Sequence, residues 1–340
     1  MLVESTDGGL LVQSDDGALW TVEGPHLISR TPTEKPFTAV TQSEMVTRLA
    51  AELPPSFGTY TTQHYVIAYD TSRVYAQWAG SLFERLHRAF TNYWQREGLE
   101  IQEPEFPLVV LIFSERGTYD AASREDLPGG VGNIIGYYSL RTNRVNMFDL
   151  TGAEALRGQE RRRGSFREIN QMLSQPAAVP LVSTVVHEAT HQIAFNCGLQ
   201  TRYADLPLWL LEGMAVYFEA PDLTSARGWT GIGRVNYPRL ETFRRNVSKW
   251  NDGTLPGLVS DDKRFRDPRA SVDAYADAWA LNYYLIKYQP KAYAAYLKQM
   301  SEKRPLMETD AKTRLDEFRR HFGDLKQLEQ DFMKRMSRVE

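Results

Sequence analysis

The sequence predicts an α+β protein in which a mixed sheet is followed by a mainly helical part. Three observations lead to this fold class: an alternating pattern around a turn in residues 10–22, strand and helix patterns in turn over residues 60–151, and helical periodicity from residue 177 onward. With 340 residues, 42% of them hydrophobic, the chain can bury a large core. We expect three segments: a small N-terminal β-rich module at 1–56, an α/β sheet subdomain with an edge-strand hairpin at 57–175, and a helical subdomain at 176–340.

The N-terminal module should begin with a β-hairpin. Residues 10–13 and 18–22 are rich in apolar side chains and flank the turn residues 14–17. A short helix should follow over residues 43–52, because prolines bracket this stretch and Ser43 is a suitable N-cap.

The sheet subdomain opens with a strand at residues 64–69 and a long amphipathic helix, which Ser72 caps and Gly98 ends. Residues 108–113 are continuously apolar, which predicts a strand buried on both faces. A short helix near residues 119–123 should follow this strand.

Two further strands, residues 134–140 and 144–148, are separated by only three residues and should form a hairpin. The glycine-rich turn before them, at residues 128–132, lacks a following Gly-Lys-Ser/Thr and is therefore not a phosphate-binding loop. Residues 151–175 are polar, and the three arginines at 161–163 alternate with acidic residues, which indicates a solvated loop.

Charge and cysteine content narrow the class of protein. A formal net charge of -3 and a pI near 6.1 argue against a nucleic-acid partner, because such proteins usually carry a basic excess. The single cysteine, Cys197, cannot form an internal disulfide and should be a buried residue on a helix.

No apolar run approaches the roughly 18 residues of a membrane span, so we expect no integral membrane segment. Residues 2–5 show no signal-peptide pattern, and the oligomeric state stays open.

The pattern that carries chemistry lies in residues 182–195, which have apolar residues at helical spacing between Pro180 and a glycine at 198. His187 and His191 are four residues apart, so their side chains should be neighbours on one helix face, about 5–6 Å apart at Cβ. Two imidazoles at this spacing can bind one zinc ion. Glu188 would then lie beside the metal, where its carboxylate can take a proton from water.

A catalytic zinc ion needs a third protein ligand and an open coordination position. Residues 206–219 predict a second helix, with Asp205 as a plausible N-cap, and Glu212 lies within its apolar stretch. A lone buried carboxylate would be costly unless it were paired or bound to a metal. Glu212 is therefore the expected third ligand, with Glu219, two turns later on the same face, as the alternative or as a partner that orients a ligand.

These two motifs together resemble the gluzincin metallopeptidases, the clan of thermolysin and of the aminopeptidase N type. The resemblance rests on His187-Glu188-x-x-His191 and, twenty residues later, on Glu212 within the segment 209–219. It looks closest to an uncharacterised gluzincin-like family with the same glutamate helix, and it covers roughly residues 60–290.

The resemblance implies a thermolysin-like fold with Zn²⁺ held by His187, His191 and Glu212, and with Glu188 as the catalytic base. It also implies that an edge strand of the sheet receives the substrate in extended form. A donor to the developing oxyanion is expected as well. Tyr275, which lies in a segment similar to one that recurs in the family, and His321 are the two candidates.

The sequence also departs from the clan. Val216 stands where the thermolysin type has an aspartate four residues after its glutamate ligand, so the partner that orients the histidines is not identified. No Gly-Ala-Met-Glu-Asn-type segment is present for gripping a free amino terminus, which argues against an aminopeptidase.

The sequence thus predicts a zinc metallopeptidase that hydrolyses peptide bonds in a peptide or protein substrate, in the manner of an endopeptidase, with a metal-activated water and Glu188 as general base. Two alternatives stay open. One is a catalytically inactive gluzincin-like protein that binds an extended peptide or glycan. The other is a zinc amidohydrolase that acts on non-peptide amides of the cell wall. The compartment is not determined, although similarity to largely exported relatives favours a location outside the cytoplasm.

Overall fold

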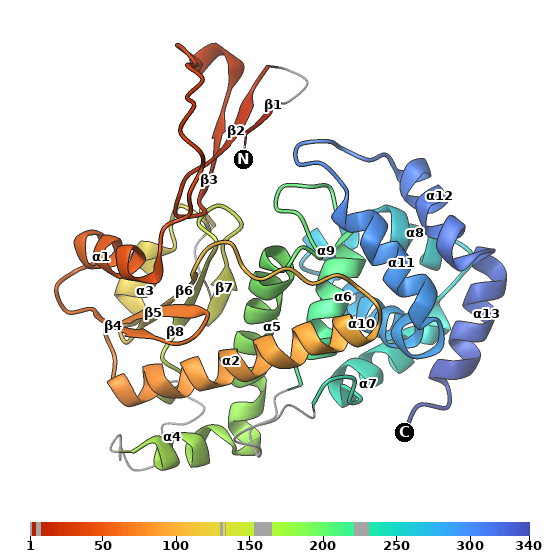
Figure 1. The fold of residues 1–340 in the computed structure, drawn as a ribbon. Helices are drawn as coiled ribbons and strands as arrows, with labels where there is room; N and C mark the ends of the chain where they lie inside the picture. The colour runs from red at the N-terminus through yellow and green to blue at the C-terminus, as the bar shows by residue number, and fades with distance from the viewer. Residues whose placement is uncertain (1, 5–7, 130–131, 133, 153–164, 221–230) are drawn as a thin grey trace. The chain divides into compact units, whose positions relative to one another are not determined.

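The protein has a mixed α+β fold with a five-stranded mixed sheet, a smaller three-stranded sheet and many helices (Figure 1). The computed structural model describes the chain except at residues 1, 5–7, 130–131, 133, 153–164 and 221–230. The chain forms two compact units. The first comprises Met1–Ala89, Gln102–Cys197 and Pro221–Trp229, and the second comprises Phe90–Ile101, Gly198–Ala220 and Thr230–Glu340. The predicted segment boundaries after residues 56 and 175 stay predictions.

The three-stranded sheet lies at the N-terminus, in the first unit. Strands β2 (Leu10–Gln13) and β3 (Leu19–Val22) pair antiparallel, which confirms the predicted hairpin. Its turn contains Gly17 at φ +84°, a left-handed conformation that favours glycine. Strand β1 (Leu2–Glu4) adds a third strand that was not predicted, and it pairs antiparallel with β2.

Helix α1 (Gln42–Glu52) matches the predicted helix but has a different N-cap. The prediction of Ser43 was wrong, because Thr41 caps the helix by accepting a hydrogen bond from the backbone N–H of Glu44. The Glu44 carboxylate in turn accepts the N–H of Thr41, which completes a capping box. This reciprocal arrangement satisfies two backbone donors, whereas a cap at Ser43 would satisfy one.

The five-stranded sheet belongs to the first unit and has the order β4-β5-β6-β8-β7. Its strands are β4 (Gly58–Thr61), β5 (Tyr65–Tyr69), β6 (Leu108–Phe113), β7 (Gly136–Tyr138) and β8 (Arg144–Phe148). Strands β5, β6 and β8 run parallel, whereas β4 and β7 are antiparallel to their neighbours at the two edges. The predicted β7–β8 hairpin is confirmed, and β7 is an edge strand.

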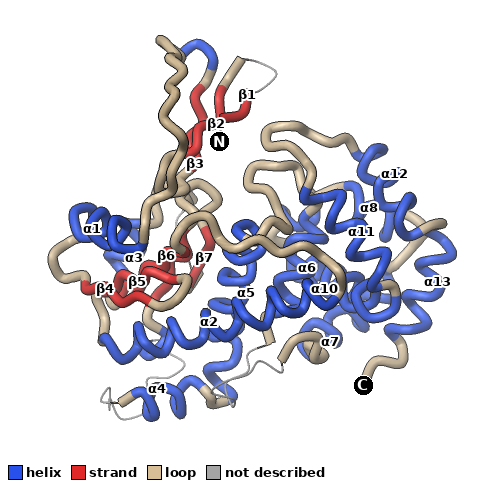
Figure 2. The backbone as a smooth tube through the Cα atoms, viewed as in Figure 1, coloured by secondary structure: helices blue, strands red, loops and turns tan. Residues whose placement is uncertain are grey.

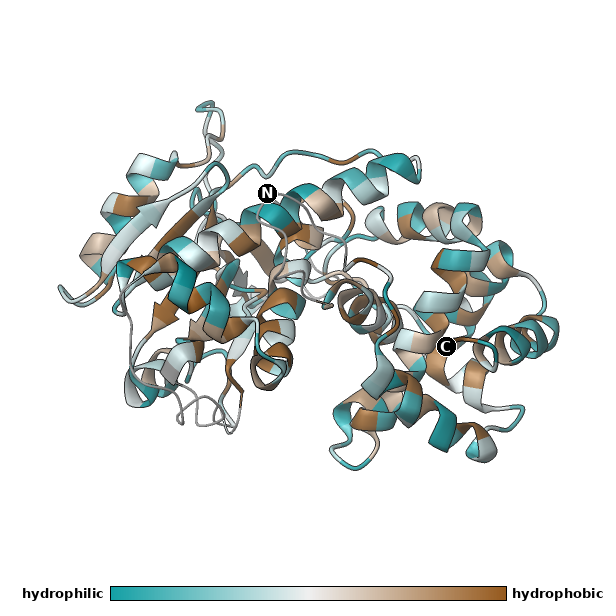
Figure 3. Cartoon of the chain, turned by 90° about the horizontal axis from the view of Figure 1, so that it is seen from below, coloured by the Kyte–Doolittle hydropathy of each residue, from teal (hydrophilic) through white to brown (hydrophobic). Residues whose placement is uncertain are grey.

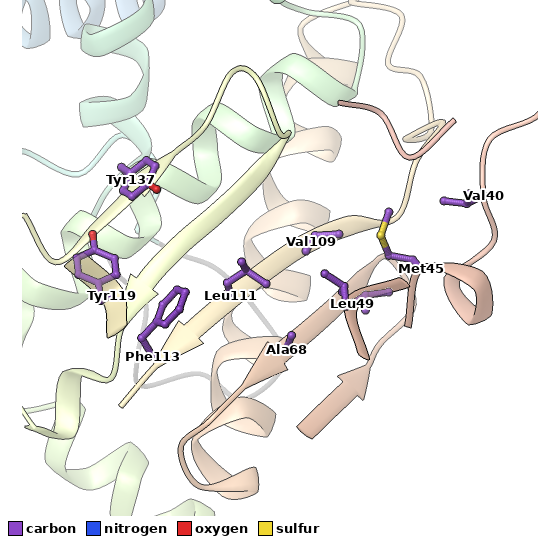
Figure 4. Close-up of a cluster of buried hydrophobic side chains, with 10 residues drawn as sticks. Val40, Met45, Leu49, Ala68, Val109, Leu111, Phe113, Tyr119 and Tyr137 are labelled. Carbon is purple, nitrogen blue, oxygen red and sulfur yellow. The ribbon is translucent and has the colours of Figure 1, made fainter. Parts of the chain in front are cut away.

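Both faces of this sheet are covered, as the continuous apolar run of β6 predicted. On one face the side chains of β5, β6 and β7 pack with α1 and α3 (Arg116–Ala122), as Figure 4 shows. On the other face Tyr65 stacks on Phe83 of α2 (Arg73–Arg96) at 5.5 Å between ring centroids. The predicted cap of α2 is confirmed, since the Ser72 hydroxyl accepts the N–H of Tyr75, and Gly98 at φ +86° follows its end.

Part of the polar stretch at 151–175 is helical, which corrects its prediction as a loop. Helix α4 (Phe166–Leu173) begins at Ser165, whose hydroxyl accepts the N–H of Glu168, and it buries Ile169 and Leu173. The arginines at 161–163, like part of the glycine-rich turn at 128–132, lie outside the described residues.

The helical periodicity predicted from residue 177 onward is confirmed. Helix α5 (Val179–Asn196) belongs to the first unit. The second unit carries α6 (Leu208–Phe218), α7 (Tyr237–Asn246), α8 (Thr254–Ser260), α9 (Lys263–Arg266), α10 (Ser271–Tyr288), α11 (Pro290–Ser301), α12 (Ala311–Phe322) and α13 (Leu325–Met336) (Figure 2). Short 3-10 turns lie at Gly24–His26, Leu150–Gly152, Pro176–Ala178 and Val247–Lys249.

Helices α12 and α13 are amphipathic, because each buries one apolar face and exposes polar residues on the other. Figure 3 shows hydrophilic and hydrophobic residues alternating along many helices of the chain. Helix α10 is different, because nearly all of its residues from Ala274 to Ile286 are buried. It contacts α6, α7 and α9 and therefore forms the centre of this unit. Within the described part of the chain, no helix combines the length and apolar character that crossing a membrane requires.

Candidate metal centre

Helix α5 brings the two histidines together. Pro180 occupies its first turn, where a missing N–H costs nothing, and Gly198 at φ +85° follows its end. His187 and His191 lie one turn apart, with their Nε2 atoms 3.2 Å from each other and their ring planes at 80°. His191 is buried and His187 is half-buried.

This spacing suits zinc. Two nitrogens at about 2.0–2.1 Å from one ion, separated by a tetrahedral angle, lie about 3.3 Å apart. The observed 3.2 Å between the Nε2 atoms of His187 and His191 matches that value. The two imidazoles, both on α5, therefore place their Nε2 atoms where one zinc ion could contact both.

Glu188 lies beside this pair and is held by the edge strand of the sheet. Its Oε2 atom accepts a hydrogen bond of 2.8 Å from the backbone N–H of Tyr138 in β7. A pocket of about 400 Å³ opens next to it. The pocket is lined by Ile134, Ile135, Gly136, Tyr137, Pro180, Leu181, Thr184 and Glu188. A mostly apolar hollow thus lies between an edge strand and the carboxylate.

Helix α5 is fixed to the sheet by a buried amide. The Nε2 atom of Gln192, a residue with no exposed surface, donates to the carbonyls of Val109 in β6 and Asn143 before β8, at 3.0 and 2.9 Å. Because a buried carbonyl without a partner costs about 1–3 kcal/mol, both bonds stabilise this docking. Gln192 follows His191 directly, so the bonds also fix the turn that carries the ligand pair.

Helix α6 carries Glu212, and its first turn is capped by a residue that lies far away in the sequence. The expected cap, Asp205, was wrong: the N–H of Leu208 donates to Oδ1 of Asp262, 54 residues further along the chain, at 3.0 Å. The guanidinium of Arg314 bridges Asp262 and Asp205, and all three side chains are largely removed from solvent. A charge-assisted network therefore anchors the first turn of α6.

Gly213, the residue after Glu212, lets α6 approach α10 closely. A Cβ atom at this position would lie 2.5 Å from the carbonyl oxygen of Ala278 and would overlap the amide nitrogen of Asn282. That amide donates to the carbonyls of Trp209 and Ala278, at 2.8 Å each. The hydroxyl of Tyr293 donates to the Asn282 Oδ1 atom and completes a buried polar link between the helices.

Among the described residues, His187, His191 and Glu212 form a group that could hold a metal ion, since one candidate ligand atom from each lies within 4.8 Å of the others. The group contains the three predicted ligands. Glu219, the alternative, is not part of it, and its Oε1 atom accepts a hydrogen bond of 2.7 Å from Asn236. Two imidazoles and one carboxylate are a donor set that catalytic zinc sites use, with one position left open.

The two predicted oxyanion donors lie in the second unit. Tyr275, in α10, packs edge-on against Phe265 and lies under the guanidinium of Arg239, with centroid distances of 5.6 Å in both cases. His321, in α12, is 2.7 Å from the Gln299 amide oxygen. The role of Tyr275 as an oxyanion donor stays a prediction.

Two further histidines, the buried His87 and the half-buried His64, lie together in the first unit. His64 and His87 stack at 4.0 Å, and His64 Nδ1 is 2.7 Å from Glu84. The hydrogen bond to Glu84 raises the pKa of His64, whereas burial lowers the pKa of His87 to about 4. Burial alone would raise the pKa of Glu84, but hydrogen bonds from His64 and Thr62 bring it down to about 2.

Sequence reasoning missed the residues that hold the candidate ligands and Glu188 in place. These are Tyr138 and Gln192 in the first unit, and Asp262, Asn282 and Arg314 in the second. The sequence offered one usable signal, since glycine directly after Glu212 in an apolar helix indicates a close approach of another backbone. The other contacts join residues far apart in the chain and leave no local pattern.

Part of the chain matches a protein family that has no assigned activity. Residues 181–307 match a family described as a protein of unknown function, DUF1570. This range contains most of α5, all of α6 and α10, and therefore the three candidate ligands, Glu188 and Tyr275. No curated protein matches the chain.

Proposed function

We propose that this protein is a zinc-dependent metallopeptidase of the gluzincin type with a thermolysin-like fold. One observation carries the proposal: a His-His-Glu group that could hold a metal ion, with Glu188 next to the first histidine on the same helix. The 3.2 Å between the two imidazole nitrogens supports zinc as the metal. His187, His191 and Glu212 are the proposed ligands.

The sheet supports a substrate that binds in extended form along β7. Within the β7–β8 hairpin, Ser139 and Ile135 use their backbone groups to bond β8. Along an antiparallel strand, the backbone N–H and C=O groups of successive residues point alternately toward the paired strand and away from it. Gly136 and Tyr138 therefore direct their backbone groups away from β8. A peptide could pair with the outward groups of this edge strand that Glu188 does not occupy, and the adjacent pocket of about 400 Å³ could take one of its side chains.

Glu188 is the proposed general base. Its carboxylate can accept a proton from a water molecule and later return it to the leaving amine. The Tyr138 N–H occupies Oε2, which orients the carboxylate so that Oε1 can receive the proton. A bound zinc ion would supply Lewis acidity, which acidifies water and polarises the carbonyl group of the substrate.

Two variants test the proposal. Glu188→Gln keeps the shape of the side chain but removes the base, so we expect full zinc content and a loss of turnover of at least about 10²-fold. His187→Ala should lose zinc at a concentration where the wild type retains it. Zinc is measured by elemental analysis after dialysis, and cleavage is measured on a broad peptide library with and without a chelator.

The outcomes separate the three functions considered from the sequence. Chelator-sensitive cleavage of peptides that Glu188→Gln abolishes would support the metallopeptidase. A zinc-bound wild type that cleaves neither peptides nor cell-wall amides would favour the binding protein. Cleavage of cell-wall amides alone would identify an amidohydrolase with the same metal centre. Equal activity in Glu188→Gln would contradict the role assigned to this residue.

A further inference from the structure

The turn between β7 and β8 contains a buried asparagine whose polar atoms are all bonded within the first unit. Asn143 is 3% exposed and has φ +62°, a left-handed conformation that asparagine tolerates better than most residues. Its backbone N–H donates to the Ser139 carbonyl, and its own carbonyl accepts from Gln192. The backbone conformation of this turn therefore aims the Asn143 side chain inward.

The Asn143 side chain pairs with an asparagine on α5. Its Nδ2 donates to Oδ1 of Asn196 at 2.8 Å, and Nδ2 of Asn196 donates back to Oδ1 of Asn143 at 2.7 Å. The same Asn143 oxygen accepts the Tyr138 hydroxyl at 2.7 Å. We call these three side chains, Asn143, Asn196 and Tyr138, the amide latch.

The amide latch connects directly to Glu188 through Tyr138. The backbone N–H of Tyr138 holds the Glu188 carboxylate, and its ring stacks on Phe195 of α5 at 5.7 Å. Glu188, Phe195 and Asn196 are spaced seven and eight residues apart, so they lie on one face of the helix. Strand β7 and helix α5 are therefore connected at two places, about two helical turns apart. One is the Tyr138 N–H bond to Glu188, and the other is the amide latch, and Tyr138 takes part in both.

We propose that Asn143 and Asn196 are positioning residues, whose pairing fixes β7 in the register that lets Tyr138 orient Glu188. This inference rests on the proposed function for its effect on turnover, but its structural part does not. A one-residue slip of an edge strand moves every side chain to the opposite face of the sheet, so Tyr138 would lose its hydrogen bonds to Glu188 and Asn143. The three-residue strand β7 has few other bonds with which to resist such a slip.

Three variants distinguish a positioning role of the amide latch from a role in the stability of the β7–β8 turn alone. Asn143→Gly removes the latch but suits the left-handed backbone. Asn143→Asp keeps an oxygen that accepts from Tyr138 and Asn196, and should restore part of the effect. Thr142→Ala, in the same turn, is the matched control, because the Thr142 hydroxyl has no hydrogen-bond partner in the described structure and takes no part in the latch.

The first readout is amide hydrogen exchange at single residues in the full-length protein, measured with zinc added. In Asn143→Gly the Tyr138 N–H should exchange about tenfold faster, the factor expected for one lost hydrogen bond, with partial recovery in Asn143→Asp. The Ser139 N–H, which donates to the Arg144 carbonyl, is the internal reference. Unchanged exchange at Tyr138, or an equal rise at Tyr138 and Ser139, would overturn the proposal.

The second readout is the steady-state kinetics of peptide cleavage. Asn143→Gly should lower kcat by about 10- to 100-fold, as loss of an orienting contact does, while zinc content stays that of the wild type. A turn that only stabilises the fold would not change kcat of the folded enzyme, so wild-type kcat in Asn143→Gly would contradict the latch. A wild type that binds zinc but cleaves nothing would contradict the proposed function. The hydrogen-exchange measurement would still show whether the amide latch holds the Tyr138 N–H on Glu188.

Discussion

Helices α5 and α6 each carry metal-ligand candidates, but the protein holds them by different means. Helix α5 is tied to the sheet by polar side chains, through Gln192 and Asn196 on the helix and Tyr138 on β7. Helix α6 is almost wholly apolar, and close packing against α10 and a capped first turn hold it. Directional bonds fix the rotation of α5, on which the aim of Glu188 depends, whereas α6 needs only to present one carboxylate.

The largest effect should come from the network that caps α6. Arg314→Met keeps the length of the side chain but leaves Asp205 and Asp262 without their shared cation. Removing one partner of a buried ion pair costs about 3–5 kcal/mol, so the free energy of unfolding should fall by about that amount. Urea denaturation measures it, with Arg319→Met on the same helix as an exposed control. A loss no larger than in the control would mean that packing alone holds α6.

A polar tie of α5 should come next. Gln192→Leu has a similar volume but leaves the carbonyls of Val109 and Asn143 without its amide, so we expect a loss of about 2–3 kcal/mol. The exposed Gln63, changed to leucine, provides the control in the same unit. If Gln192→Leu were as stable as the wild type, the contrast between a bonded α5 and a packed α6 would fail.

The packing of α6 is tested at Gly213. Gly213→Ala places a methyl group against Ala278 and Asn282, and forced overpacking of this kind costs about 1–3 kcal/mol. The matched control is Gly257→Ala in α8, where an added Cβ meets nothing within 4 Å and where alanine favours the helix. Thermal denaturation should therefore show opposite signs for the two variants. Equal stability would indicate that α6 has room beside α10.

The smallest effect is a pH dependence that arises away from the metal centre. The pKa of His87 falls from 6.5 to about 4, so below pH 6.5 the unfolded chain binds a proton that the folded chain refuses. The stability that neutral His87 contributes is thus present above pH 6.5 and lost as the pH falls through 4.

His87→Phe should remove most of this loss while keeping a flat ring against His64. The groups that face His87 act differently. His64, whose pKa is raised, keeps its contribution below pH 6.5, and Glu84, whose pKa is lowered from 4.5 to about 2, loses its contribution mainly below pH 4.5. The measurement is the denaturation midpoint at pH 7 and pH 4.5. The same pH dependence in His87→Phe and in the wild type would assign it to other groups.

Most of the five-stranded sheet and helices α1, α2, α3, α5 and α6 could be predicted from the sequence, because their patterns are local, whereas α7 to α13 were predicted only as a stretch of helical periodicity. The β7–β8 hairpin, β6 and α2 with its Ser72 cap are confirmed in this way. Two of the missed helix starts, at Thr41 and Ser165, also have local signals, since a glutamate follows each of them three residues later. The helix α4 was missed because polar residues surround it and hide its short apolar face.

The sequence by itself determined that His187 and His191 share one helix face, because a spacing of four residues fixes this whatever the rest of the chain does. Only the tertiary structure decided what aims Glu188 and what caps α6. Tyr138 lies 50 residues before Glu188, and Asp262 lies 54 residues after Leu208. The physical reason is that helix geometry depends on adjacent residues, whereas a hydrogen bond between distant segments depends on how the whole core packs.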